Sequence, residues 1–156
     1  MGLKVYIASR SEMEKAYAIV QEYYEAAAVV VREDAAQFAG EYFKDGSGIW
    51  LAEDDGQVVG CIALRELAGK SRCGEIKRLY VRPSHRGKGL ADQLLEALEA
   101  YAKASGYKWL YLDTAAEMRA AARFYEKKGF EGCERYNDNP QAAIFMRKQT
   151  DRNACP

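Results

Sequence analysis

The segment from residue 75 to residue 113 constrains the fold more than any other part of the chain. Its pattern predicts a strand, a loop with two glycines, a long amphipathic helix over 89–105 and a second strand. Gly106 can supply the left-handed residue with which such a helix ends. Because two strands that are joined by a crossover helix run parallel, this segment predicts a parallel strand pair.

The other strands are predicted to pair in antiparallel fashion, which makes the sheet mixed. Short turns join 49–53 to 57–66 and 57–66 to 75–81, and Asp54-Asp55-Gly56 is typical of a hairpin turn. We expect strands over 4–9, 49–53, 57–66, 75–81, 109–113, 131–136 and 143–148, and helices over 11–27, 33–43, 89–105 and 114–128, with capping boxes at 11–14 and 114–117. The predicted fold class is α/β (mixed α+β), a seven-stranded sheet with about four helices on its two faces.

The length of 156 residues fits one domain, which we place at 1–148, followed by a flexible tail over 149–156. The longest apolar run covers only 26–31, and the N-terminal residues lack the apolar block of a signal peptide, so we expect a cytoplasmic protein without a membrane segment. The four cysteines have no metal-ligand spacing, and His85 is the single histidine, so we expect reduced thiols and no metal. The cysteines are Cys61, Cys73, Cys133 and Cys155.

The charge of the chain is balanced overall but unevenly distributed. The 23 basic and 23 acidic side chains cancel, which argues against a protein that coats nucleic acid. Residues 1–64 carry 5 basic and 11 acidic side chains, whereas residues 65–88 carry 8 basic and 2 acidic ones. The basic band suits a compact polyanion such as a nucleotide-like cofactor, although a solvated charged surface is the alternative interpretation.

The loop at 86–91 has the composition of a phosphate-binding turn. Its glycines allow close approach of backbone amides, the following helix start adds partial positive charge, and Arg86 and Lys88 add full charges. Lys88 is followed by Gly89 and not by Ser or Thr, which excludes a P-loop. Asp92 stands where a dinucleotide-binding loop has its third glycine, which excludes that motif as well.

The segment resembles instead the GNAT acyltransferases, which bind acetyl-CoA. Arg86-x-x-Gly89-x-Ala91 matches their Arg/Gln-x-x-Gly-x-Gly/Ala signature, and the run from Phe124 to Phe130 is similar to the family's Phe-Tyr-Glu-Lys-x-Gly-Phe helix end. The close resemblance covers residues 49–148. Residues 1–48, which in this family shape the acceptor pocket, match only in outline.

The resemblance implies where acetyl-CoA and the reacting groups lie. Backbone groups of a bulged strand at 75–81 would bind the pantetheine arm, Tyr125 would lie beside the cofactor sulfur, and Glu75 would be the base. Many members have an asparagine where this chain has Met118, and Thr114 is a candidate to replace its hydrogen bond. The cofactor-binding set implied is Leu79, Tyr80, Val81, Arg86, Gly87, Lys88, Gly89, Leu90, Ala91, Thr114 and Tyr125.

We therefore expect an acetyl-CoA-dependent N-acetyltransferase that acetylates a primary amine of a small molecule or peptide by direct attack, with catalytic residues Glu75 and Tyr125 and no metal. The alternative is a non-catalytic acyl-CoA-binding sensor or partner subunit. Glu75 could instead pair with neighbouring cations, Tyr125 could be a core aromatic, and Asp113 is expected to cap the next helix. We expect no nucleic-acid or membrane partner, and leave a homodimer open. The acidic N-terminal part predicts a cationic acceptor, unless its charges merely face solvent.

Overall fold

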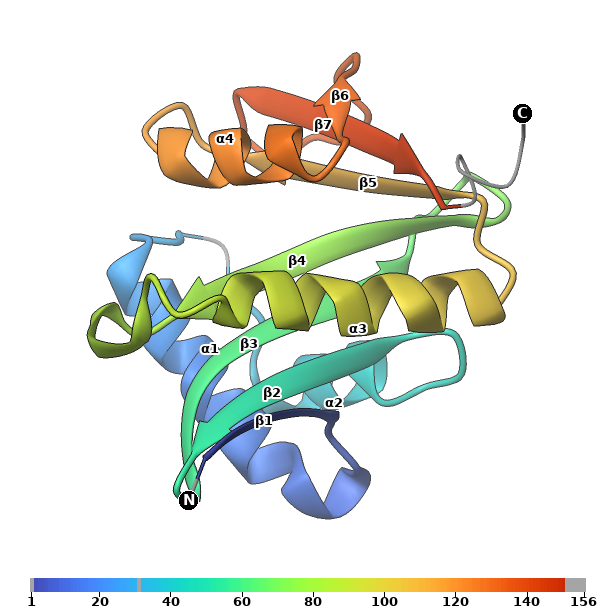
Figure 1. Ribbon diagram of the computed structural model, residues 1–156. Coiled ribbons are helices and arrows are strands. Elements are labelled where there is room, and N and C mark those ends of the chain that lie inside the picture. The colour runs from blue at the N-terminus through green and yellow to red at the C-terminus, as the bar shows by residue number, and fades with distance from the viewer. Residues whose placement is uncertain (1, 31, 151–156) are drawn as a thin grey trace.

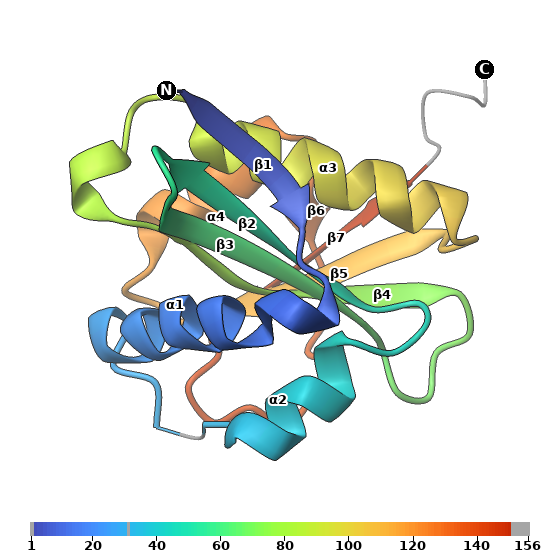
Figure 2. The ribbon, with the colours of Figure 1, turned by 90° about the horizontal axis from the view of Figure 1, so that it is seen from below.

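The chain folds around one mixed sheet of seven strands in the order β1-β2-β3-β4-β5-β7-β6 (Figures 1 and 2). The computed structural model describes residues 2–30 and 32–150. The strands are β1 (Leu3–Ile7), β2 (Gly48–Asp54), β3 (Gln57–Glu66), β4 (Cys73–Val81), β5 (Trp109–Thr114), β6 (Glu131–Gly132) and β7 (Ile144–Gln149). The helices are α1 (Met13–Ala26), α2 (Ala35–Tyr42), α3 (Leu90–Ala104) and α4 (Arg119–Lys127). The predicted fold class is confirmed.

Helices cover both faces of the sheet. Helices α1 and α2 pack on one face, around a core that includes the fully buried Phe38 and Tyr24, while α3 and α4 lie on the other (Figure 1). The apolar stripe of α3 and the aromatic end of α4, with Tyr125 and Phe130, share the second core. No helix in the described part of the chain is both long and apolar enough to cross a membrane.

The sheet opens where β4 and β5, the parallel pair among the described strands, diverge. Strands β4 and β5 are paired from Cys73–Ile76 to Trp109–Leu112, and beyond these residues the two strands separate (Figure 1). The last five residues of β4, 77–81, thus keep β3 as a neighbour on one edge and have a free edge on the other. This opening positions the candidate site.

Several predicted boundaries are wrong for identifiable reasons. The first capping box is formed by Ser9 and Glu12, two residues before the predicted one, and opens a short 3-10 turn that leads into α1. Thr114 cannot cap a helix, because its backbone is paired with Ile144 in the sheet, and α4 begins only at Arg119.

The predicted strand 131–136 is likewise too long, because β6 ends at Gly132 and the following chain turns inward, where Tyr136 contacts Glu75. The predicted tail begins too early. Strand β7 runs through Gln149, and the amide of Thr150 donates to the carbonyl of Lys108. The rest of that tail, 151–156, which holds Cys155, lies outside the described residues.

Candidate active site

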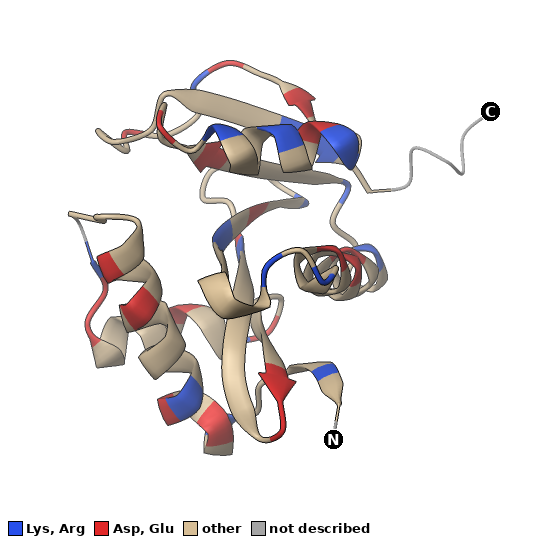
Figure 3. Ribbon diagram, turned by 60° about the vertical axis from the view of Figure 1, so that its left-hand side comes forward, with Lys and Arg blue, Asp and Glu red and all other residues tan. Residues whose placement is uncertain are grey.

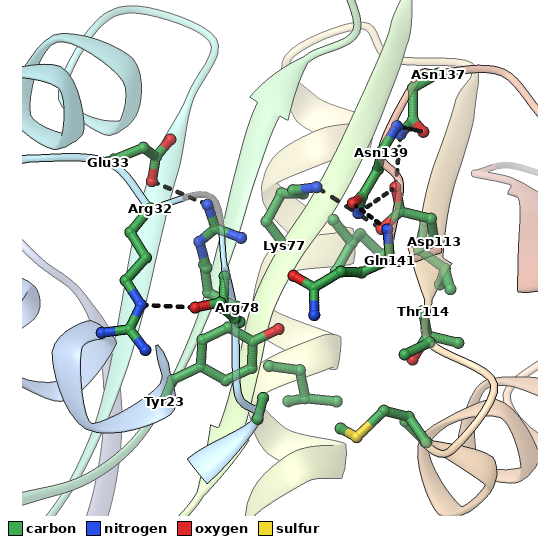
Figure 4. A pocket seen from close by; sticks show the side chains of 18 of the residues that line it. Tyr23, Arg32, Glu33, Lys77, Arg78, Asp113, Thr114, Asn137, Asn139 and Gln141 are labelled. Atoms are coloured by element: carbon green, nitrogen blue, oxygen red, sulfur yellow. Dashed lines mark hydrogen bonds and ion pairs between the residues drawn. The ribbon is translucent and has the colours of Figure 1, made fainter. Parts of the chain in front are cut away.

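A cavity of about 620 Å³ lies at the opening between β4 and β5. Its lining comes from the end of α1 with the following loop, Gln37 of α2, Arg65 of β3, the middle of β4, the end of β5 with the following loop, α4, and the loop 137–141. Figure 4 shows side chains from these segments converging on one space: Tyr23, Arg32, Glu33, Lys77, Arg78, Asp113, Thr114, Asn137, Asn139 and Gln141.

A β-bulge in β4 directs two successive cations to one face of the sheet. The register with β3 changes between Cys61 and Ala63, and Arg78 has a φ of 63°, in the left-handed region. Successive side chains of a regular strand point to opposite faces, so Lys77 and Arg78 would normally diverge. The extra residue of the bulge lets both line the cavity. The predicted bulged strand is thereby confirmed.

Arg78 is held by aromatic rings and by one carboxylate. Its side chain is 10% exposed, and its Nη2 donates to Glu33 Oε1 at 3.1 Å. The guanidinium carbon lies 5.2 Å from the ring centre of Tyr24 and 6.0 Å from that of Tyr23. Its Nε is buried and has no hydrogen-bond partner among the described residues. Burial raises the pKa of the Tyr23 phenol, which therefore stays protonated at neutral pH.

Asp113 and the loop 137–141 form the opposite wall. Asn137 Nδ2 donates to the Asp113 carboxylate, and Lys77 Nζ lies 3.7 Å from its other oxygen. Gln141 fastens the loop to the segment after α1: its side chain accepts from the amide of Val30 at 2.8 Å and donates to the carbonyl of Ala28 at 3.1 Å. Asp113 does not cap α4, contrary to the prediction, because its side chain lies in the cavity wall.

Glu75 lies behind this wall and does not line the cavity. It is 1% exposed. Arg65 Nε donates to one of its oxygens at 2.9 Å, and Tyr136 and Asn137 donate to the other at 2.8 and 3.2 Å. Lys77 Nζ lies 3.8 Å from the same carboxylate. Glu75 thus reaches the cavity through Asn137 and Lys77.

Tyr125 lines the cavity from α4. A turn through Gly129, with φ of 97°, ends the helix, and the amide of Phe130 donates to the carbonyl of Tyr125 at 3.0 Å. The Phe124 and Phe130 rings contact the Tyr125 ring edge to face, at 5.3 and 5.1 Å between ring centres. Burial strongly raises the pKa of the Tyr125 phenol, and its hydroxyl has no hydrogen-bond partner among the described residues.

The free edge of β4 presents the peptide groups of Leu79 and Val81. The amide of Arg82 donates to Val59 of β3, so by strand alternation the groups of Val81 and Leu79 face the other way. Arg86 Nε reaches back to the carbonyl of Val81 at 2.9 Å, which confirms that this carbonyl points outward. Tyr80, in contrast, pairs with Cys61 and buries its side chain against α1.

The glycine loop follows directly after this edge. Gly87 and Gly89 both have φ of 79°, and Gly89 is the residue before the first turn of α3. Arg86 through Gly89 are exposed, while Leu90 is buried and anchors the helix start. Asp92 in that first turn pairs with Lys128 at the end of α4, which ties the loop's helix to the helix of Tyr125.

Sequence reasoning missed Asp113 and the whole loop 137–141 as parts of the site. It also misplaced the acidic charge: acidic residues of the first 64 spread along α1 and the end of β2 (Figure 3), and among them only Glu33 lines the cavity. Thr114 and Met118 both line the cavity. Cofactor binding by Thr114 stays a prediction. His85 lies outside, bonded to Asp54 at 2.8 Å.

Comparisons with known proteins agree with this architecture. The sequence matches the acetyltransferase (GNAT) family over residues 13–130. An uncharacterized N-acetyltransferase of Schizosaccharomyces pombe is 36% identical over 108 residues, which cover 67% of this chain and 66% of the relative. The chain matches about half to two thirds of the length of the first curated relatives, 66% and 54%.

Solved structures of similar fold are more distant in sequence. A GNAT-family acetyltransferase of Staphylococcus aureus superposes with a TM-score of 0.82 at 18% identity, covering 96% of this chain and 100% of that one. A structure described as a putative acetyltransferase of Salmonella typhimurium with its cofactor acetyl-CoA gives 0.76 at 20% identity, covering 100% and 98%. The family match extends over most of the chain, which therefore belongs to the GNAT acetyltransferase family.

Proposed function

We propose that the protein transfers the acetyl group of acetyl-CoA to a primary amine of a small molecule or peptide by direct attack. The observation that carries this proposal is the opening of the sheet at Lys77. It leaves one edge of β4 free, and this edge leads along the chain into the glycine loop, while Leu79 and Tyr125 both line the cavity. An extended arm can pair with such an edge as another strand would, and amides at a helix start suit a pyrophosphate.

The acetyl group would be transferred at the end of this edge. The amine nitrogen attacks the thioester carbonyl carbon, the carbon–sulfur bond breaks, and CoA leaves as a thiolate. The Leu79 amide, on the free edge, is the proposed donor to the oxygen that gains charge. Tyr125, whose pKa is raised by burial, holds a proton that it can donate to the thiolate.

Two carboxylates are candidates to take the proton of the amine. The family resemblance implies Glu75, but its four neighbours separate it from the cavity. Asp113 lines the cavity directly and shares Asn137 and Lys77 with Glu75. We therefore extend the proposal: Asp113 receives the proton, and Glu75 acts as a positioning residue that fixes Asn137 and Lys77 beside it.

The test is thiol release from acetyl-CoA with a panel of primary amines, as a function of pH. In Asp113→Asn we expect a loss of about a hundredfold in kcat/KM at neutral pH that shrinks at alkaline pH, where the free amine needs no base. Asp138→Asn, which removes another carboxylate from the cavity lining, is the matched control and should change little.

Glu75→Gln separates the two roles. Replacing the carboxylate leaves Arg65 and Lys77 without their shared counter-charge in a buried site, so we expect a clear loss of thermal stability. A pH-dependent rate defect in Glu75→Gln together with a normal profile in Asp113→Asn would return the base to Glu75. Tight acetyl-CoA binding without thiol release for any amine would favour the non-catalytic alternative.

A further inference from the structure

The bulge of β4 gives the cavity a pair of cationic groups with unused hydrogen-bonding capacity. We propose that Lys77 and Arg78 form a subsite for a carboxylate of the acceptor, so that the enzyme acts on small zwitterionic amines of the amino-acid type. This inference rests on the proposed acetyl transfer and names its substrate class. It reverses the expectation of a cationic acceptor that the acidic N-terminal part suggested.

Arg78 carries the argument because its guanidinium is only partly used. Of its three nitrogens, Nη2 bonds to Glu33, while Nε is buried without a partner. Among the described residues Nη1 also has no partner, and it is not enclosed by protein, so it faces the cavity. Nη1 is thus the donor that a ligand in the cavity can reach, and an ionised acceptor is the strongest partner that a ligand can offer it.

The backbone conformation of Arg78 is a second observation that indicates a functional role for this residue. A non-glycine residue at φ of 63° is strained, and such strain persists where the surrounding structure holds the residue in a functional position. Here the strained residue is the one that brings the second cation to the same face as Lys77. Without the bulge, strand alternation would point one of the two side chains away from the cavity.

Neighbouring groups complete a site for one anion. Lys77 Nζ lies 3.7 to 3.8 Å from the carboxylates of Asp113 and Glu75, beyond hydrogen-bond distance, and keeps donors available. The hydroxyl of Tyr23 points into the cavity beside Arg78 (Figure 4) and is a third donor. Three donors that converge from α1 and β4 can surround a carboxylate.

The charge balance of the walls selects a zwitterion over a simple anion. The four cations of the lining, Arg32, Arg65, Lys77 and Arg78, face three lining carboxylates, Glu33, Asp113 and Asp138, and the buried Glu75 behind the wall supplies the fourth negative charge. A ligand with one charge of each sign preserves this neutrality, its carboxylate on the Arg78 side and its amine toward Asp113. Leu79 follows Arg78 directly along β4, so the carboxylate subsite adjoins the proposed point of attack.

The experiment compares each proteinogenic amino acid with its own carboxamide as acceptor, by thiol release at fixed pH. We expect kcat/KM for the free acid to exceed that for the carboxamide by about tenfold or more, the size of a charge-assisted hydrogen bond. The carboxamide has the more acidic ammonium and hence more free amine, so this bias works against the proposal.

Variants then locate the preference. Arg78→Met and Lys77→Met should each reduce the acid-to-carboxamide ratio, Arg78→Met to about threefold or less. Because both substrates are measured on one preparation, the folded fraction cancels in the ratio, and poor folding cannot imitate the effect. Arg82→Met, the same change at a residue that pairs with Glu22 outside the cavity, is the control and should keep the parental ratio.

Two outcomes overturn the inference and can be told from failure of the proposed function. An acid-to-carboxamide ratio of kcat/KM near or below one in the parental protein would contradict the carboxylate subsite but not acetyl transfer. A ratio that stays unchanged in both Arg78→Met and Lys77→Met would do the same. If no amine supports thiol release, calorimetry decides: N-acetyl amino acids, with CoA present, should bind more tightly than their carboxamides. Equal binding overturns the subsite as well.

Discussion

The loop 86–91, which follows the free edge of β4, and the loop 137–141, which lines the cavity, are held in place in different ways. The first is local: two glycines with φ of 79° and the start of α3 fix its backbone, with Arg86 returning to the nearby Val81. The second depends on partners that are distant in sequence. Gln141 bonds to the backbone of residues 28 and 30, and Asn137 bonds to both Glu75 and Asp113.

This difference suggests that the two loops serve different ligands, the first acetyl-CoA and the second the acceptor. A self-contained loop of backbone amides suits an invariant ligand, because pyrophosphate recognition requires little from side chains. A wall assembled from side chains of separate segments can change its shape and charge without disturbing the cofactor site. We therefore expect changes in the first loop to affect acetyl-CoA, and changes in the second to affect the acceptor alone.

The largest effect is expected for Gly89→Asp. The left-handed backbone at Gly89 and the added negative charge both oppose pyrophosphate binding, and we expect acetyl-CoA affinity to fall by about a hundredfold or more. Thermal shift with acetyl-CoA measures this directly, since a ligand that binds the native state raises the melting temperature.

Gly89→Asn is the matched control for this change. Asparagine tolerates the left-handed region and has nearly the shape of aspartate without its charge. A shift that survives in Gly89→Asn and disappears in Gly89→Asp assigns the loss to charge. An equal, full shift in both variants would remove the loop from the cofactor site.

The next effect concerns Tyr125→Phe, at the boundary between the two regions. Its hydroxyl has no hydrogen-bond partner among the described residues, so removing it should leave stability and acetyl-CoA affinity near parental. We expect kcat to fall by about tenfold or more, because the thiolate loses its proton donor. The defect should be smaller with an acyl donor whose leaving thiol is more acidic.

The pH profile provides a second check on Tyr125. Burial raises the pKa of this phenol above its ordinary value near 10, so it stays protonated as pH rises through the alkaline range. Ionisation of Tyr125 should therefore not lower the parental rate below pH 10. Any loss of rate in that range should also be present in Tyr125→Phe. Stability that falls together with activity in this variant would instead identify Tyr125 as a packing residue.

The same contrast explains how much the sequence could predict. The glycine loop, its helix and the aromatic end of α4 are encoded by local patterns, and all were predicted close to their observed positions. Asp113 was assigned to a helix cap because sequence shows only that it ends a strand. Its true surroundings depend on Asn137, 24 residues away, whose position follows from a loop without periodicity.

Glu75 shows the same limit within a well-predicted strand. Its place on β4 was predicted correctly, but Arg65, Tyr136 and Asn137 reach it from three other segments, and no local pattern indicates that they enclose it. The bulge at Arg78 was expected only through the family resemblance. A left-handed arginine has no signature in sequence, since glycine is the residue that ordinarily marks such a backbone position.

The smallest effect is expected for Gln141→Ala. The change removes the two hydrogen bonds to the backbone of Ala28 and Val30, which are exposed to solvent and contribute about 1 kcal/mol each or less. Loosening the loop should raise KM for the acceptor by about three- to tenfold. The melting-temperature shift caused by acetyl-CoA should stay parental, because the glycine loop is held independently. Gln57→Ala, at an exposed position of the β2–β3 hairpin, is the control. A reduced acetyl-CoA shift in Gln141→Ala would show that the two regions are coupled, and the acceptor wall would then have to be treated as part of the cofactor site.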